Sequence, residues 1–88
     1  MSTLLVTYDL KKPGQDYKDF LELIRKYPYA RLSESSYAIS TYESPKNVYE
    51  KLVSHMDKND QLYVITLCSP YFGMGPVNVN DWLASALK

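Results

Sequence analysis

The chain has 88 residues, and its ten lysine and arginine residues balance ten aspartate and glutamate residues. This length suits one domain over residues 1–88, and the neutral balance disfavours strong phosphate-driven binding by an isolated subunit, because such domains often have a pI above about 9. The lone cysteine excludes an internal disulfide and fits a reducing compartment. The sequence has no signal-peptide pattern and no apolar run of roughly 18 residues, so we expect a cytoplasmic protein without a membrane span.

The N-terminal segment predicts a strand followed by a helix. Side chains alternate over Thr3–Asp9, with apolar groups on both faces, as in a central strand. A helix is expected from a cap at Asp16 to about Tyr27, because apolar residues at positions 17, 20, 21 and 24 form one stripe. Pro28 ends it, since the residue before a proline avoids the helical region.

A hairpin follows this helix. Tyr29–Ser33 and Ser36–Tyr42 are short segments with strand-like alternation, and Glu34 and Ser35 between them predict a tight turn.

A second helix and a fourth strand complete the repeating part of the pattern. Ser44 is a suitable helix cap, and Pro45 suits the first helical turn. The predicted buried stripe of this helix consists of Val48, Leu52, Val53 and Met56. After a polar turn at residues 57–60, Gln61–Leu67 is rich in residues that favour strands.

The C-terminal segment predicts a loop and a short helix. Ser69–Val79 contains two glycines and two prolines, which favours an irregular connection. Asn80 or Asp81 can then cap a final helix that carries Trp82, Leu83 and Leu87.

The order strand-helix-strand-strand-helix-strand predicts an α+β, ferredoxin-like sandwich in which two helices cover one face of an antiparallel sheet. The other face would carry Leu5 and one set of fourth-strand side chains, either Tyr63, Ile65 and Leu67 or Leu62 and Val64. An uncovered apolar face favours a homodimer, formed through the sheet or by exchange of the C-terminal segment. The alternative is that the C-terminal loop and helix cover this face within one chain.

Several stretches between residues 4 and 67 resemble a known group of small proteins. They are Val6-Thr7-Tyr8-Asp9 with Leu10, Pro13-Gly14-Gln15-Asp16-Tyr17, Leu32-Ser33-Glu34-Ser35-Ser36-Tyr37-Ala38-Ile39, and Asn59-Asp60-Gln61-Leu62-Tyr63-Val64. They are similar to SinR-like proteins of bacteria and phages, which are related to the CRISPR-associated, endoribonuclease-like subunit of spacer acquisition and more distantly to VapD toxins.

This resemblance implies a dimeric, ferredoxin-like subunit, in some members with an exchanged C-terminal strand. In the CRISPR branch an aspartate at the end of the first strand is proposed to bind Mg²⁺ with its symmetry mate, and Asp9 would take that role here. The sequence departs from that branch in its first helix, which has acidic residues where the branch has clustered arginines, and in its tail after Cys68.

Three residues are candidates for a site. Asp9 could contribute a carboxylate to Mg²⁺, or simply accept backbone hydrogen bonds in the turn that follows it. Arg31 and Ser36 could contact a phosphate of a nucleic acid, or only stabilise the hairpin. Cys68 ends an apolar strand and has no basic neighbour in the sequence, so we expect a buried, inert thiol.

Three functions fit these features. The first is a non-catalytic dimeric module that binds nucleic acid, a protein or a small ligand, with no certain cofactor. The second is a Mg²⁺-dependent endoribonuclease that uses Asp9 from both subunits. The third is a phage or plasmid regulator of a host defence system.

Overall fold

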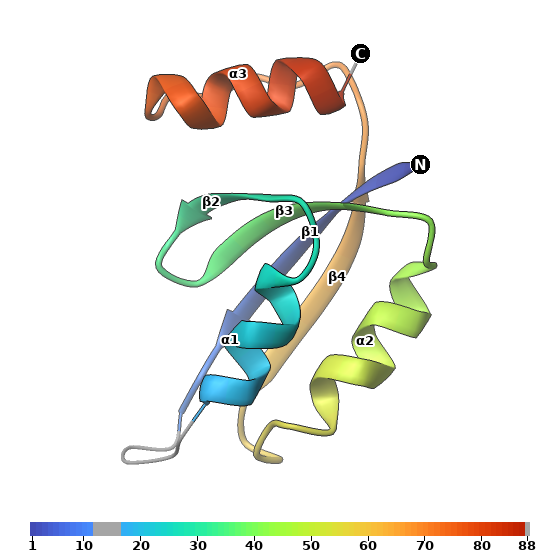
Figure 1. Ribbon diagram of the computed structural model, residues 1–88. Helices are drawn as coiled ribbons and strands as arrows, with labels where there is room; N and C mark the ends of the chain where they lie inside the picture. The colour runs from blue at the N-terminus through green and yellow to red at the C-terminus, as the bar shows by residue number, and fades with distance from the viewer. Residues whose placement is uncertain (12–16, 88) are drawn as a thin grey trace.

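The computed structural model describes residues 1–11 and 17–87, and this part of the chain forms one four-stranded sheet and three helices (Figure 1). In chain order the elements are β1 (Ser2–Asp9), α1 (Lys18–Arg25), β2 (Tyr29–Ser33), β3 (Ser36–Thr41), α2 (Pro45–Val53), β4 (Gln61–Leu67) and α3 (Val77–Ala86). The predicted α+β class is therefore confirmed. Tyr17 occupies the N-cap position of α1, and the predicted cap, Asp16, lies outside the described residues.

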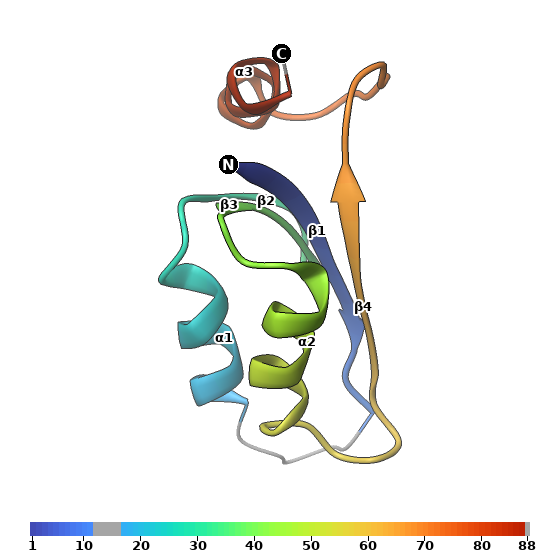
Figure 2. The ribbon, with the colours of Figure 1, turned by 90° about the vertical axis from the view of Figure 1, so that its right-hand side faces the viewer.

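The sheet is antiparallel, with the strand order β2-β3-β1-β4. In the register of the two central strands and β4, Val6 lies opposite both Tyr37 and Val64. The helices α1 and α2 lie together on one face of the sheet (Figure 2). This arrangement is compatible with the ferredoxin-like order expected from the sequence.

The core lies between this sheet face and the two helices. Its fully or nearly fully buried members are Leu4, Val6, Tyr8, Phe20, Ile24, Tyr37, Ile39, Val48 and Leu52. Phe20 of α1 meets the Tyr8 ring edge to face, with 4.9 Å between the ring centroids. Because β1 and β3 place alternate side chains on opposite faces, their remaining side chains point away from α1 and α2.

The second helix begins as its sequence predicts. The Ser44 hydroxyl accepts a hydrogen bond from the backbone N–H of Asn47 at 3.1 Å, and Pro45 is the first helical residue. Its predicted buried stripe is wrong at one position: Val53 is 38% exposed. Five residues of helix rotate Val53 by about 140° from the buried Val48, which turns it toward the side of the helix.

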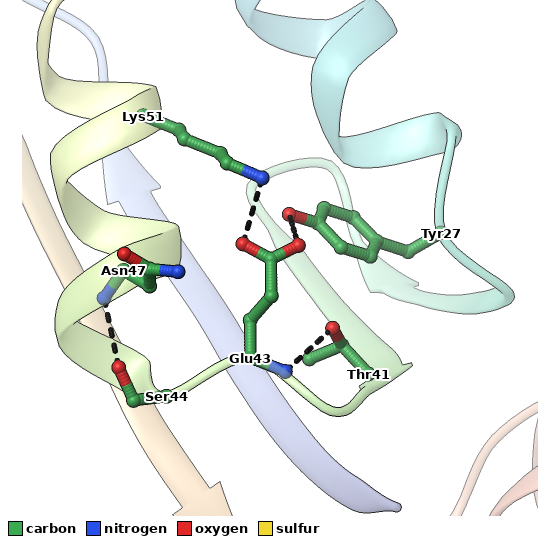
Figure 3. Close-up of polar contacts among 6 residues, drawn as sticks. All are labelled: Tyr27, Thr41, Glu43, Ser44, Asn47 and Lys51. Atoms are coloured by element: carbon green, nitrogen blue, oxygen red, sulfur yellow. Dashed lines mark hydrogen bonds and ion pairs between the residues drawn. The ribbon is translucent and has the colours of Figure 1, made fainter.

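Polar contacts fasten the start of α2 to the end of α1 (Figure 3). The Tyr27 hydroxyl donates to Glu43 Oε2 at 2.9 Å, and Lys51 Nζ lies 2.7 Å from Glu43 Oε1. The Glu43 backbone N–H donates to the Thr41 hydroxyl at 3.0 Å. Lys51 and Tyr27 together hold the pKa of Glu43 below its usual range, because both favour the charged carboxylate.

The third helix starts earlier than predicted. It begins at Val77, directly after Pro76, so the prediction of a loop up to Val79 and a cap at Asn80 or Asp81 is wrong. Asn80 lies inside the helix, where its backbone N–H donates to the Pro76 carbonyl at 3.0 Å. Val79 is buried and Leu83 is partly buried on the same face, so tertiary packing outweighs the local capping preference of Asn80.

This helix covers only part of the sheet face that α1 and α2 leave open. It packs against β2, on the opposite side of the sheet from α1 (Figure 1). Ala30 and Ala38 are neighbours on this open face, and both are buried. Thr3 is also buried, with its hydroxyl 3.5 Å from the Ala86 carbonyl oxygen. The tail therefore covers the β2–β3 side of the face within one chain.

Candidate functional site

The β4 side of the open face carries an exposed apolar surface. Its members are Leu5 of β1 and Tyr63 and Ile65 of β4, here named the β4 patch. Leu5 and Ile65 are direct cross-strand partners, and Tyr63 pairs with Thr7. Ile65 is 49% exposed and Tyr63 is 61% exposed, whereas Leu5 is half-buried. Of the two sets of β4 side chains left open by the sequence, the structure thus selects Tyr63, Ile65 and Leu67 for this face.

A hollow beside β4 is lined by both polar and apolar residues. It has a volume of about 320 Å³ and lies between α2 and the outer edge of β4. Its apolar lining comes from Tyr49, Val53, Met56, Leu62 and Tyr63. The outward rotation of Val53 thus adds an apolar side chain to the lining of this hollow.

The loop between β4 and α3 presents a second apolar surface. Phe72 and Met74 are fully exposed, and Val77 at the start of α3 is largely exposed. The Ser69 hydroxyl donates to the Leu87 carbonyl, and Asn80 Nδ2 donates to the Gly75 carbonyl at 3.1 Å. Both ends of the loop are thus fastened to α3 while its apolar side chains point outward.

Asp9 lies at the end of β1, on the same sheet face as Leu5 and Thr7. Its Oδ2 is 2.9 Å from Lys11 Nζ, and about half of each side chain is exposed. The hydrogen bond and the charge of Asp9 raise the pKa of Lys11. Asp9 is therefore accessible, but a cation of the same chain already accompanies it.

The described residues of a single chain do not form a metal centre. They contain no group of three or more histidine, cysteine, aspartate or glutamate side chains that could hold a metal ion. Mg²⁺ prefers six oxygen ligands, most of which can be water and phosphate. The protein usually has to supply one or two carboxylates. One Asp9 beside an ammonium group fits this requirement poorly, so a second copy would have to supply another carboxylate.

Arg31 and Ser36 lie on opposite faces of the sheet. The Ser36 and Thr7 hydroxyls are 3.0 Å apart on the open face. Arg31 is opposite Tyr37 on the helix-covered face, where its Nε donates to the Ser33 carbonyl at 3.2 Å. The structure does not bring these two predicted phosphate contacts together.

Asp60 is a structurally central carboxylate that the sequence suggested only as part of a polar turn. It accepts hydrogen bonds from the backbone N–H groups of Lys11 at 2.7 Å and Asp57 at 2.9 Å. The Tyr17 hydroxyl donates to its Oδ2 at 2.9 Å. These contacts join the end of β1, the start of α1 and the α2–β4 turn at one end of the molecule.

Cys68 is exposed, which corrects the expectation of a buried thiol. It comes directly after the last residue of β4, where the chain leaves the sheet. The strand pattern predicted burial, but β4 is an edge strand and its end is not covered.

Among the residues that the structure describes, no helix has the length and apolar character needed to cross a membrane.

Comparison with protein-family models, curated proteins and solved structures finds no match for this chain. The resemblance to SinR-like and CRISPR-associated proteins thus stays a prediction.

Proposed function

We propose that this protein is a homodimeric assembly module in which two copies meet through the β4 patch. The observation that carries this proposal is the exposure of Tyr63 and Ile65 side by side on a regular sheet face, next to Leu5. Burial of such apolar area stabilises an association by about 25 cal/mol per Å² before the entropic costs of binding are subtracted.

A second copy is the partner that the chemistry of the patch favours. None of its three residues is charged, so two identical patches can meet without repulsion between like charges. A two-fold contact requires only that one surface complements itself, and flat sheet faces satisfy this by packing about 10 Å apart. The formal net charge of zero adds no long-range repulsion between copies.

Sedimentation of the wild type and two variants tests this proposal. The wild type should sediment as a dimer, and Ile65→Glu should shift it to a monomer because two buried carboxylates would face each other without partners. Tyr42→Glu is the matched control, since Tyr42 is 84% exposed and lies outside the patch. A monomeric wild type at high concentration, or equal effects of the two substitutions, would contradict the proposal.

We further propose that the fold is ferredoxin-like and that the chain is kin to the SinR-like and CRISPR-associated proteins it resembles. The strand order and the two helices on one face support the first part of this proposal. The diffuse sequence resemblance supports the second.

A second candidate function is a Mg²⁺-dependent endoribonuclease that uses Asp9 from both subunits. It is supported by one observation: Asp9 shares a strand and a sheet face with Leu5 of the β4 patch. Two copies packed face to face could bring their two carboxylates toward one metal ion, which would polarise a phosphodiester and activate water.

The nuclease candidate is tested with purified wild type and Asp9→Ala on single-stranded RNA. It predicts cleavage that requires Mg²⁺ or Mn²⁺ and that Asp9→Ala abolishes while the dimer persists. Lys11→Gln is a useful companion, because removal of the competing ammonium should increase metal-dependent cleavage. If the wild type does not cleave RNA with either metal, the endoribonuclease candidate is wrong, and the assembly proposal is unaffected.

A further inference from the structure

Near the β2 edge of the sheet, opposite to β4, two arginines converge on one buried tyrosine of β3. Arg25 is the last residue of α1, and Arg31 lies in the edge strand β2. Their Cζ atoms lie 5.9 Å and 5.8 Å from the centroid of the Tyr37 ring. Tyr37 itself is fully buried, so its ring is a fixed platform near which both guanidinium groups lie.

Each guanidinium group is oriented by neutral acceptors. Arg25 donates from Nε and Nη2 to the Tyr37 hydroxyl, at 3.3 Å and 3.0 Å. Arg31 donates from Nε to the Ser33 carbonyl and from Nη2 to the Glu34 carbonyl, at 3.2 Å and 3.3 Å. A guanidinium group has five N–H donors, so each arginine keeps three donors that these bonds do not use.

The positive charge of this pair is not compensated within the part of the chain that the structure describes. Neither arginine forms an ion pair with a carboxylate there. Burial raises the pKa of the Tyr8 hydroxyl, and the positive charges of both arginines oppose this shift. Both guanidinium groups are therefore close enough to Tyr8 to influence its hydroxyl electrostatically. The two positive charges near this ring repel each other, and an anion bound between or beside them would offset the repulsion.

Ordinary structural roles explain only part of this arrangement. A cation in the last turn stabilises the dipole of α1, which accounts for the charge of Arg25. A charged side chain on an edge strand discourages aggregation, which accounts for the charge of Arg31. Neither role requires both side chains to fold back onto the same ring.

An exposed aromatic ring lies beside the pair. Tyr29 contacts Tyr37 edge to face, with 5.4 Å between the ring centroids, and 40% of Tyr29 is exposed. If the arginines hold an anion, the Tyr29 ring can therefore pack against a flat or apolar group attached to that anion.

We propose that Arg25 and Arg31 form a binding site for a phosphate monoester, with Tyr29 against the group that carries the phosphate. Guanidinium groups match the oxygens of a phosphate through paired, charge-assisted N–H···O bonds. The site lies on the helix-covered side of the β2 edge, away from the β4 patch, so it does not depend on the proposed self-association.

Titration of the full-length protein, followed by NMR of the arginine Nε–H signals, tests this site. Ribose 5-phosphate and adenosine monophosphate are the two probes, because they share the phosphate and differ in the base. Both should shift the Arg25 and Arg31 signals saturably at millimolar concentrations, and Arg31→Gln should weaken binding about tenfold. Lys46→Gln, which removes one exposed charge elsewhere, should leave the affinity within about twofold.

Further variants keep the test decisive. Arg25→Lys keeps the charge but loses the planar fork, so it should weaken binding even if Arg25→Gln does not fold. Tyr29→Leu should weaken the binding of adenosine monophosphate more than that of ribose 5-phosphate, because the base packs on the Tyr29 ring. An equal loss for both probes would overturn the proposed role of Tyr29. Absence of a saturable shift at either arginine, or an equal loss in Lys46→Gln, would overturn the proposal. Binding of single-stranded RNA without binding of either monoester would overturn it as well.

Discussion

Glu43 shows how a single residue connects two elements of this protein. It follows β3 and precedes α2, yet its carboxylate contacts Tyr27 after α1 and Lys51 within α2. Tyr27 is half-buried, and burial together with its bond to the Glu43 carboxylate raises the pKa of its hydroxyl. The proton therefore stays on Tyr27 at neutral pH, and the charge stays on Glu43.

We expect Tyr27→Phe to lower the free energy of unfolding by about 1 kcal/mol at neutral pH, because it removes a hydrogen bond to a charged acceptor. The folded pKa of Glu43 lies below its ordinary value of 4.5. Its stabilising contribution is therefore complete above that ordinary value and fades as the pH falls through the lower folded value. Urea denaturation from neutral pH to pH 3 should show the difference between variant and wild type shrinking in acid.

Tyr42→Phe is the control for this measurement, because Tyr42 is 84% exposed and makes no such contact. A loss in Tyr27→Phe that stays constant down to pH 3 would mean that the hydroxyl does not stabilise the fold through the charged form of the Glu43 carboxylate.

Residue contacts of this kind could not be predicted from the sequence. Asp60 and Lys11 are 49 positions apart, and only the folded chain brings them together. Arg25 and Tyr37 are closer in sequence, but their contact depends on the crossing of α1 over β3. By contrast, the Ser44 cap is a contact over three residues, and the sequence predicted it.

At the scale of elements, periodicity predicted the strands and helices where one face is buried. The helix α2 shows the limit of this method, because Val53 is as apolar as Val48 but lies beside the stripe. Composition does not distinguish two valines; their angular positions around the helix do.

Two substitutions in α2 measure this difference. Val48→Ala should cost about 2 kcal/mol of stability, because it leaves a space in a packed core. Val53→Ala, at a position 38% exposed, should cost less than about 0.5 kcal/mol. Equal losses in chemical denaturation would mean that α2 is rotated relative to the structure described here.

The helix α3 shows a different limit. Glycines and prolines before it predict a loop, and its polar residues Asn80 and Asp81 predict a cap, but contacts with β2 decide where it starts. Such contacts join segments more than forty residues apart, so local signals could not reveal them. The candidate site was only partly predictable for the same reason, since coverage by α3 determines which half of the sheet face stays exposed.

We expect Val79→Asp to detach α3 from β2, because it places a charge at a buried position. Hydrogen exchange of β2 amides, including that of Ala30, should accelerate by about tenfold or more, while exchange in the α1–α2 core changes little. Asn78→Asp, at an exposed position of the same helix, is the control and should leave exchange unchanged. Unchanged protection in Val79→Asp would contradict the covering role of α3.

At the scale of the whole molecule, the two halves of the open sheet face differ in how much of them the chain covers. The tail covers the β2–β3 side, whereas no helix in the described part of the chain lies over the open side of β4 (Figure 2). That side keeps an uncharged apolar patch at the surface. A small domain gains little from apolar residues that stay in water, and this patch therefore supports the proposed contact between two copies. The loop after β4 exposes further apolar side chains, Phe72 and Met74.

The most direct test is an isotope-filtered NMR experiment on an equal mixture of ¹³C-labelled and unlabelled protein. A dimer formed through the β4 patch should give intermolecular NOEs from the Ile65 methyl groups of one copy to Leu5 or Tyr63 of the other. A dimer whose intermolecular NOEs arise only at other surfaces, or a protein that stays monomeric at NMR concentrations, would contradict it.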